Sequence, residues 1–358
     1  MTAIPLIRPS QSSRRLRFRA NRPQEIWADM VSRPEDIADA NALADSVMGD
    51  IRGNRLWTTA WWIATRTAYA AILKSSGRHI EESDYLAGTL GRASLSRADM
   101  AGLQRLYTFA HAGCSVVMGW DEAADRMVHF RCLDWPSAEA IARASRLYQA
   151  VDEDGVIVYR AAGILGLVGC LTAAKPGFSA AINFAPWRGP SLSPNPDPTF
   201  LLRELMESPA VTYDEARAAI TRWRPSAPVF ISLCGTHRDE ACVLSFGAAW
   251  NRHRGCHVEE IGQRPWLVQT NHFDPGGPFG YQNKPWVEED AAEWETLSLL
   301  QTSLARKEKI RKALFSAGDG LERSLRAIFA EPPVWNRQTA QWVTMIPATG
   351  EVRLEVRA

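Results

Sequence analysis

The hydrophobic pattern of this chain changes from helical to strand-like at Cys114. After this residue, short apolar runs of strand length recur between glycine, aspartate and proline turn signals. A helical interlude from about Pro198 to Trp223 and further helices within about Ala291 to Phe329 interrupt the runs. Strands in long runs with helices clustered between them predict an α+β fold in which helices are layered on sheets. The candidate strands are "CSVVMGWD", "RMVHFRCLD", "DGVIVYRAAG", "LVGCLTAAKPG", "FSAAINFAP", "APVFISLCG", "EACVLSFGAAWN", "CHVEEIG", "PWLVQTNHF" and the hairpin "AQWVTMIPATGEVRLEVRA".

Before Cys114, the sequence predicts helices from about Pro23 to Ala112. "RPEDIADANALADSVMGDI" and "LWTTAWWIATRTAYAAIL" carry apolar residues at three- and four-residue spacings, and "SLSRADMAGLQRLYTFAHAG" begins with a serine cap. The aromatic stripe containing Trp57 and Trp61 favours core packing, and a lipid-facing or acyl-binding surface is the alternative. Residues 1–22 hold six arginines and no acid, which predicts a solvated, poorly ordered arm.

Composition excludes several classes of partner. The net charge of +1 gives no global field that would recruit nucleic acid, and 46% hydrophobic with 23% charged residues is typical of a globular protein. We find no signal-peptide pattern, and six cysteines without regular spacing favour free thiols in a reducing cytoplasm. We therefore expect a cytoplasmic protein without a metal or other cofactor. The spacing of one cysteine and histidine cluster fits no usual zinc pattern: Cys234, His237, Cys242, His253, Cys256 and His257.

The segment "HAGCSVVMGWDEAADRMVHFRCLDWP" carries the chemistry of the chain. Cys114 opens one candidate strand, while Arg131 and Asp134 end the next, so a hairpin would return them to the cysteine. If the Gly113–Cys114 bond were cut, Cys114 would own a thiol and a free α-amine, with ordinary pKa values of about 8.5 and about 7.7–8.0. The amine could then act as general base for the thiol, while a carboxylate and a guanidinium orient the amine and the substrate. The alternative is two core strands with incidental polar ends.

This hairpin resembles the nucleophile hairpin of the cysteine-type N-terminal nucleophile (Ntn) hydrolases. That superfamily includes acid ceramidase, N-acylethanolamine-hydrolysing acid amidase, choloylglycine hydrolase and penicillin V acylase. Its Cys-Thr/Ser and Arg-x-x-Asp-aromatic pattern is matched here by Cys114-Ser115 and by residues 131–135. The resemblance continues in the same order over roughly residues 85–358, through "GLVGCLTAAKPGFSAAINFAP", "TFLLRELMESPAVTYDEARAAITRWRPSAPVFISLCG", "PWLVQTNHFD" and "QWVTMIPATGEVRLEVR".

The resemblance implies a four-layer α-β-β-α sandwich and a role for each matching residue. Cys114 would be the nucleophile, Arg131 the group that positions thiol and substrate, and Asp134 the partner of the α-amine. Asn271 would donate its side-chain amide to an oxyanion hole, which Asn183 would help to frame. Two positions depart from the ceramidase branch: Phe184 follows Asn183 where an acid is usual, and Lys284 is offered where an arginine is expected.

The sequence therefore predicts an amidohydrolase that acts on a linear, non-peptide N-acyl amide after scission before Cys114. Residues 1–113 would form a helical N-terminal segment that stays bound, and residues 114–358 would form the catalytic core. The rivals are an acyltransferase that uses the same thioester and a non-catalytic family member that binds acylated ligands. Peripheral lipid contact through the N-terminal helices, the oligomeric state and the identity of the acyl chain are left open.

Overall fold

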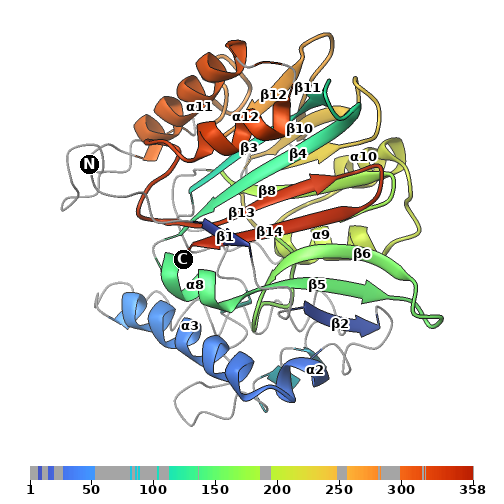
Figure 1. Ribbon diagram of the computed structural model, residues 1–358, viewed down its shortest axis with the longest axis vertical. Coiled ribbons are helices and arrows are strands. Elements are labelled where there is room, and N and C mark those ends of the chain that lie inside the picture. Colours follow the sequence, from blue (N-terminus) through green and yellow to red (C-terminus); the bar gives the residue numbers. More distant parts are fainter. Residues whose placement is uncertain are drawn as a thin grey trace.

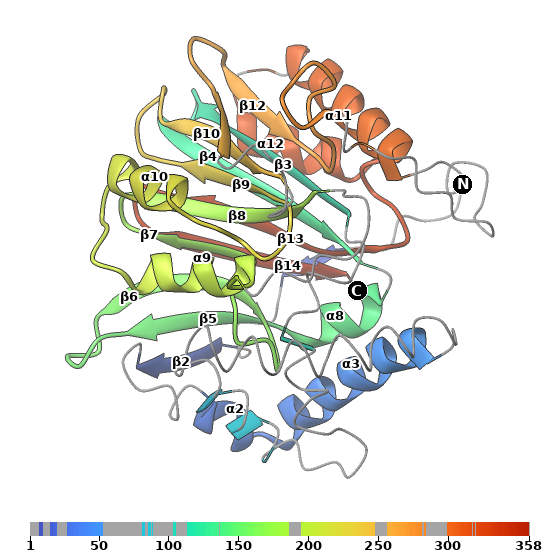
Figure 2. The same ribbon diagram turned by 180° about the vertical axis from the view of Figure 1, so that it is seen from behind.

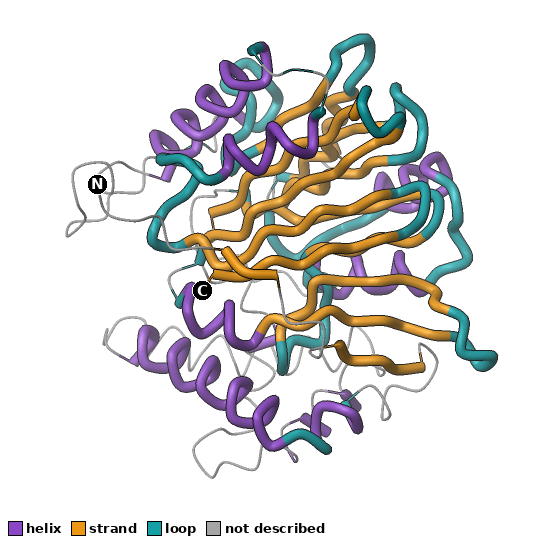
Figure 3. Tube along the Cα trace, in the orientation of Figure 1, coloured by secondary structure: helices purple, strands orange, loops and turns teal. Residues whose placement is uncertain are grey.

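Two β-sheets lie face to face in this protein (Figures 1 and 3). The computed structural model describes residues 7–9, 15–19, 27–52, 81–82, 85–86, 88, 103–104, 113–135, 137–185, 195–247, 256–280, 283, 299–316, 318 and 320–357. One sheet has six strands, in the order β1 (Ile7–Pro9), β14 (Glu351–Arg357), β13 (Thr339–Ile346), β4 (Arg126–Asp134), β3 (Gly113–Asp121) and β12 (Trp266–Gln269). The other has eight, in the order β11 (Cys256–Glu260), β10 (Ala241–Phe246), β9 (Val229–Cys234), β8 (Phe178–Phe184), β7 (Thr172–Lys175), β6 (Ile157–Ile164), β5 (Ser145–Val151) and β2 (Arg15–Arg19).

Helices cover the outer faces of both sheets. The helices α11 (Leu299–Phe315) and α12 (Leu321–Phe329) pack on β3, β4 and β12, as Figure 1 shows. The helices α9 (Pro198–Glu207) and α10 (Tyr213–Thr221) pack on the eight-stranded sheet and are seen from behind in Figure 2. At one end, α3 (Pro34–Arg52) follows α2 (Ala28–Val31) and packs against α8 (Ala138–Ala144). The predicted α+β fold with four layers in the order α-β-β-α is confirmed.

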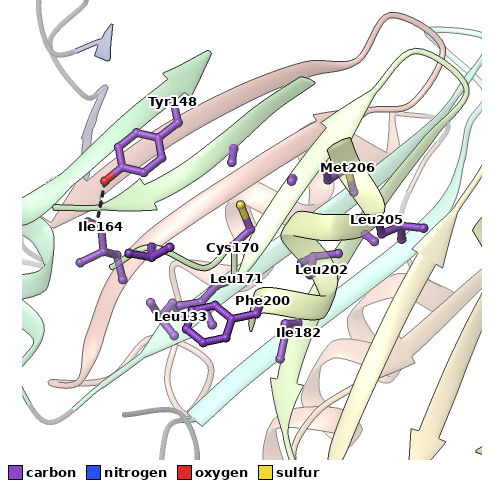
Figure 4. Close-up of a cluster of buried hydrophobic side chains, with 14 of the residues drawn as sticks. Leu133, Tyr148, Ile164, Cys170, Leu171, Ile182, Phe200, Leu202, Leu205 and Met206 are labelled. Atoms are coloured by element: carbon purple, nitrogen blue, oxygen red, sulfur yellow. Dashed lines mark hydrogen bonds between the residues drawn. The ribbon is translucent and has the colours of Figure 1, made fainter. Parts of the chain in front are cut away.

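The strands β3 and β4 read as nearly continuous apolar runs because both of their faces are covered. In β4, Phe130 and Cys132 face α11 and α12, while Leu133 faces the other sheet. Figure 4 shows Leu133 with Ile182 of β8 and Phe200 of α9 in the main hydrophobic cluster between the layers. Alternate side chains of one strand therefore reach opposite sides of the six-stranded sheet, which becomes important at the active site.

Local sequence signals set the ends of the helices on the eight-stranded sheet. The Thr212 hydroxyl accepts the backbone N–H of Glu215, and the Glu215 carboxylate accepts the backbone N–H of Thr212, which together form a capping box. Asp197 caps α9 in the same way through Thr199. Both helices therefore begin at a residue whose side chain caps the first turn.

The structure corrects one expectation and adds two elements. The described parts of residues 1–22 do not form a solvated arm, because β1 pairs with β14 and β2 pairs in parallel with β5. Leu16 and Phe18 of β2 are buried among core aromatic residues, and this burial outweighs the solvation of the neighbouring arginines. The helix α8 and the strand β5, which follow the β3–β4 hairpin directly, were not predicted from the sequence. No helix in the described part of the chain is long and apolar enough to span a bilayer; Trp57 and Trp61 lie outside it.

A buried histidine joins the two sheets. His129 of β4 is fully buried, with Nδ1 3.0 Å from the Ser179 hydroxyl on β8 and Nε2 3.0 Å from the Ser232 hydroxyl on β9. Burial, together with the positive charge of Arg131, lowers the pKa of His129 from 6.5 to about 3. The folded protein therefore keeps this imidazole neutral at pH values at which an unfolded chain would protonate it.

We expect acid to destabilise the fold through this histidine. The unfolded chain binds a proton at His129 below pH 6.5, whereas the folded chain does not until about pH 3. The free energy of unfolding should consequently fall as the pH falls from 6.5 toward 3, by roughly 2 kcal/mol between pH 7 and pH 5 from this group. Urea denaturation at both pH values should show a smaller loss for His129→Gln, while the exposed-residue control His257→Gln should match the wild type. An unchanged pH dependence in His129→Gln would contradict this assignment.

Candidate active site

The head of β3 and the end of β4 meet in one place, as the hairpin pattern predicts. The antiparallel register places Gly113 opposite Asp134 and Cys114 opposite Leu133. Cys114 has no exposed surface, and Arg131 and Asp134 are buried as well. The site therefore consists of polar groups enclosed in the sandwich in the uncut chain.

The thiol of Cys114 lies on the inner side of the six-stranded sheet. Arg131 extends from β4 on the same side and donates through Nη2 to the Cys114 sulfur at 3.2 Å and to the Ile182 carbonyl at 2.9 Å. Burial raises the pKa of the Cys114 thiol, while the guanidinium of Arg131 acts against this rise by stabilising the thiolate. Arg131 therefore contacts the thiol directly, while its expected role in positioning thiol and substrate stays a prediction.

The backbone nitrogen of Cys114 contacts the second expected asparagine. Asn271, two residues after the end of β12, accepts the Cys114 N–H through Oδ1 at 2.7 Å. Its Nδ2 donates to the Phe184 carbonyl at 2.9 Å, so in the uncut chain this amide is not directed at an open oxyanion position. Asn271 therefore holds the nitrogen that scission would turn into an amine, a contact that sequence reasoning did not anticipate.

Asp134 lies on the helix side of the sheet, beside Gly113. Its Oδ1 accepts hydrogen bonds from the Thr339 hydroxyl at 2.8 Å and from the Cys132 thiol at 3.2 Å. Its Oδ2 has no hydrogen-bond partner among the described residues. A Cβ added to Gly113 would lie 3.1 Å from Oδ2, so glycine leaves room for the carboxylate next to the start of the proposed catalytic chain.

Asn183 is placed near the same centre but with looser contacts. It is the penultimate residue of β8, and its Nδ2 lies 3.3 Å from each of the carbonyls of Gln269 and Thr270. Its Oδ1 is buried without a hydrogen-bond partner in the part of the chain that the structure describes. The structure thus brings all five residues of the predicted site to one region, whereas Lys284 lies outside the described residues.

Sequence reasoning missed Arg306, which helix α11 places over the site. Its Nη1 donates to the Cys114 carbonyl at 2.7 Å and to the Ser115 hydroxyl at 2.8 Å, and its Nη2 donates to Asn271 Oδ1 at 2.8 Å. The same Nη1 lies 3.8 Å from Asp134 Oδ2. The buried guanidinium of Arg306 therefore binds the Cys114 carbonyl and the side chains of Ser115 and Asn271. It also lies near the carboxylate of Asp134.

The buried stripe of α11 explains how Arg306 reaches this position. Ser303, Arg306, Ile310 and Leu314 recur at helical spacing and are all buried. Ser303 accepts the backbone N–H of Asn271 at 2.7 Å, so one turn of α11 holds both the backbone and the side chain of that asparagine. The signal available in the sequence was a charged residue within an apolar stripe, hidden by the surrounding charges of "ARKEKIRK".

An apolar cavity lies beside the residue that follows Asp134. It has a volume of about 60 Å³ and is lined by Trp135, by α3 side chains including Leu43 and Val47, and by Leu165 and Leu171 of the loop after β6. Leu171 also belongs to the cluster that contains Cys114 and Leu133. Leu171 therefore links the lining of the cavity to the apolar cluster around Cys114.

The cysteines and histidines considered as zinc ligands do not form a site in the described residues. Cys234, Cys242 and Cys256 lie on three successive strands of the eight-stranded sheet, and no group of three or more potential ligands gathers among the residues described. All six cysteines are free thiols.

The four-layer sandwich with a cysteine at the head of a central strand is the Ntn-hydrolase fold. The chain is structurally similar to the Caenorhabditis elegans N-acylethanolamine-hydrolyzing acid amidase (NAAA) ortholog, with a TM-score of 0.51 and 22% identity over 66% of this chain and 93% of that one. A sequence match links it to the acid ceramidase of Balaenoptera acutorostrata scammoni, at 27% identity over 151 residues. No family model matches the chain.

These two similarities support the cysteine Ntn hydrolase superfamily that the hairpin motif predicts. The structural match establishes the fold, because it covers 93% of the amidase chain. At 22% sequence identity it establishes nothing more than the fold. The sequence match covers 36% of this chain and 34% of the ceramidase, so the chain matches about a third of that relative's length.

Proposed function

We propose that this protein is a cysteine Ntn amidohydrolase that cleaves a linear N-acyl amide after scission of its own Gly113–Cys114 bond. The observation that carries the proposal is the arrangement around Cys114. A guanidinium contacts its thiol, an amide oxygen holds its backbone nitrogen, and a carboxylate oxygen lies open beside Gly113. Each group that an α-amine mechanism requires is thus within the site before the bond is cut.

Scission would follow an N-to-S acyl shift. The Cys114 sulfur attacks the Gly113 carbonyl carbon, the peptide C–N bond breaks, and the nitrogen takes up the thiol proton. Water then hydrolyses the thioester, which releases the Gly113 carboxylate and restores the thiol. Because Cys114 is fully buried in the uncut chain, we expect the site to open to substrate only once residues before Cys114 can move.

In the mature site the same atoms would serve the substrate. The Cys114 amine takes the thiol proton as sulfur attacks the amide carbonyl, and it returns that proton to the leaving amine. Two buried guanidinium groups, Arg131 and Arg306, and a single described carboxylate, Asp134, lie around Cys114. This excess of positive charge favours a thiolate and a developing oxyanion. Asn183 and Asn271 would donate to that oxyanion once their Nδ2 groups leave the backbone carbonyls that they bond in this structure. The cavity beside Trp135 can receive apolar atoms of the acyl group.

Contacts across the proposed cut support retention of residues 1–113. Arg146 of β5 is buried and binds Asp36 at 2.5 Å and Asp39 at 2.8 Å, both on α3. Arg203 of α9 binds Glu82 at 2.6 Å, again with both side chains buried. Removing the N-terminal part would leave the buried Arg146 without its acidic partners and Arg203 with Glu207 alone, which is unfavourable.

Denaturing mass measurement combined with product analysis tests the proposal. Purified protein should yield two co-purifying fragments, residues 1–113 and 114–358, and should release a fatty acid and an amine from an N-acyl amide. An added amine that appears in the acylated product would instead indicate acyl transfer. An intact chain that hydrolyses amides would rule out the α-amine mechanism. An intact chain without activity would contradict the whole proposal.

A further inference from the structure

The carboxylate of Asp134 is held at one oxygen and open at the other. Thr339 and Cys132 both donate to Oδ1, whereas Oδ2 lies beside Gly113 without a hydrogen-bond partner among the described residues. All three side chains are nearly or fully buried, so water competes little for these bonds. Hydrogen bonds to an ionised carboxylate are among the stronger ones in proteins.

The direction of the Thr339 hydroxyl is fixed by its own surroundings. Its oxygen accepts the Asn336 N–H at 3.1 Å, which leaves the hydroxyl hydrogen to be donated to Asp134. Thr339 opens β13 at a register irregularity between Thr339 and Gln341, opposite the last residue of β4. Such irregularities re-aim side chains at the ends of sheets. Here the irregularity aligns the hydroxyl with the carboxylate.

Arg306 competes for the Asp134 carboxylate, so hydrogen bonds that fix the orientation of this carboxylate are needed. Arg306 Nη1 forms a long ion pair with Asp134 Oδ2 at 3.8 Å, and a small rotation of the carboxylate would shorten it to hydrogen-bond distance. That rotation would turn Oδ2 toward α11 and away from Gly113 and the Cys114 nitrogen. The two donors to Oδ1 oppose this rotation.

We infer that Thr339 and Cys132 are positioning residues that keep Asp134 Oδ2 free for the α-amine created at Cys114. The inference rests on the proposed function, because the amine exists only after scission. Thr339 contributes more than Cys132, since a hydroxyl is a better donor than a thiol. Neither side chain contacts the substrate or the reacting sulfur; both act through Asp134.

Thr339→Val tests the inference, because valine keeps the shape of threonine and removes the hydroxyl. Scission and kcat should fall on the order of ten- to a hundredfold, with KM changed by less than about twofold. Thr339→Ser keeps the donor and should retain most of the activity, while Cys132→Ala should show a smaller fall than Thr339→Val. Thr344→Val is the matched control, since Thr344 is a buried threonine of the same strand opposite Phe130 and away from Asp134.

The outcomes separate this inference from the proposed function. A wild-type chain that is cut and active, with Thr339→Val behaving like Thr344→Val, overturns the positioning role alone. Equal losses in Thr339→Ser and Thr339→Val also overturn it, because the hydroxyl would then not be the cause. A wild-type chain that is neither cut nor active overturns both. Should Thr339→Val fail to fold, as judged by its melting temperature, Thr339→Ser and Cys132→Ala decide the question: normal activity in Cys132→Ala removes Cys132, and impaired activity in Thr339→Ser removes the hydroxyl.

Discussion

Cys114→Ala should give a single full-length chain of 39.8 kDa that does not hydrolyse N-acyl amides. The side chain supplies the sulfur for both scission and turnover, so its removal should abolish both at once rather than weaken either. The fold should persist, because alanine at this fully buried position loses only the sulfur and its contact with Arg131. Denaturing mass measurement and an amidase assay on the same preparation provide the two readouts.

Two further variants define what this loss means. Cys114→Ser should be cut slowly, because an alcohol is a weaker nucleophile than a thiol at neutral pH. Cys234→Ala is the control: this cysteine is equally buried in a strand of the other sheet and contacts no residue of the proposed site. Two fragments in Cys114→Ala would show that another group or another protein cuts the chain. Loss of activity in Cys234→Ala would point to a general effect of removing core sulfur.

The hairpin could be predicted because its two signals are local. An apolar run that opens at Cys114 and a second that ends at Asp134 are joined by the polar turn between Asp121 and Arg126, and the register follows from pairing across that turn. Asn183 and Asn271, which lie far from the hairpin in the sequence, were predicted only from the family resemblance. Asn271 follows the end of strand β12 by two residues, and no spacing rule predicts that it accepts a hydrogen bond from the backbone nitrogen of Cys114.

The errors have a common physical cause, which is that tertiary partners override the local pattern. The arginines of "RRLRFRA" predict a solvated segment, yet β2 pairs with β5 because Leu16 and Phe18 on alternate positions are buried in the core. Arg306 was not singled out from the sequence, because it stands among other charged residues in "ARKEKIRK". Its environment is set by β3 and Asn271, which are distant in the sequence, and only its place in the buried stripe of α11 distinguishes it from its neighbours.

Arg306→Met should lower scission and kcat on the order of a hundred- to a thousandfold, which is the size expected when a charged donor is removed from an enclosed site. Methionine fills similar space but makes none of the hydrogen bonds to the Cys114 carbonyl, Ser115 and Asn271. Asn271 would then lose one of the contacts that fix its side chain. The guanidinium also stabilises the Cys114 thiolate, so the pKa of the thiol should move upward in the variant.

The pH dependence of Cys114 alkylation in the cut enzyme separates charge from packing. Arg306→Lys keeps the positive charge, so we expect the thiol to titrate close to its wild-type pH, although one ammonium cannot reproduce the two-pronged contact and kcat should remain reduced. Arg311→Met is the control, because Arg311 is an exposed arginine on the same helix. A wild-type alkylation profile in Arg306→Met would exclude any electrostatic influence on the thiol. Wild-type scission and kcat in Arg306→Met would show that Arg306 contributes to neither reaction, since loss of its buried hydrogen bonds would then have no chemical consequence.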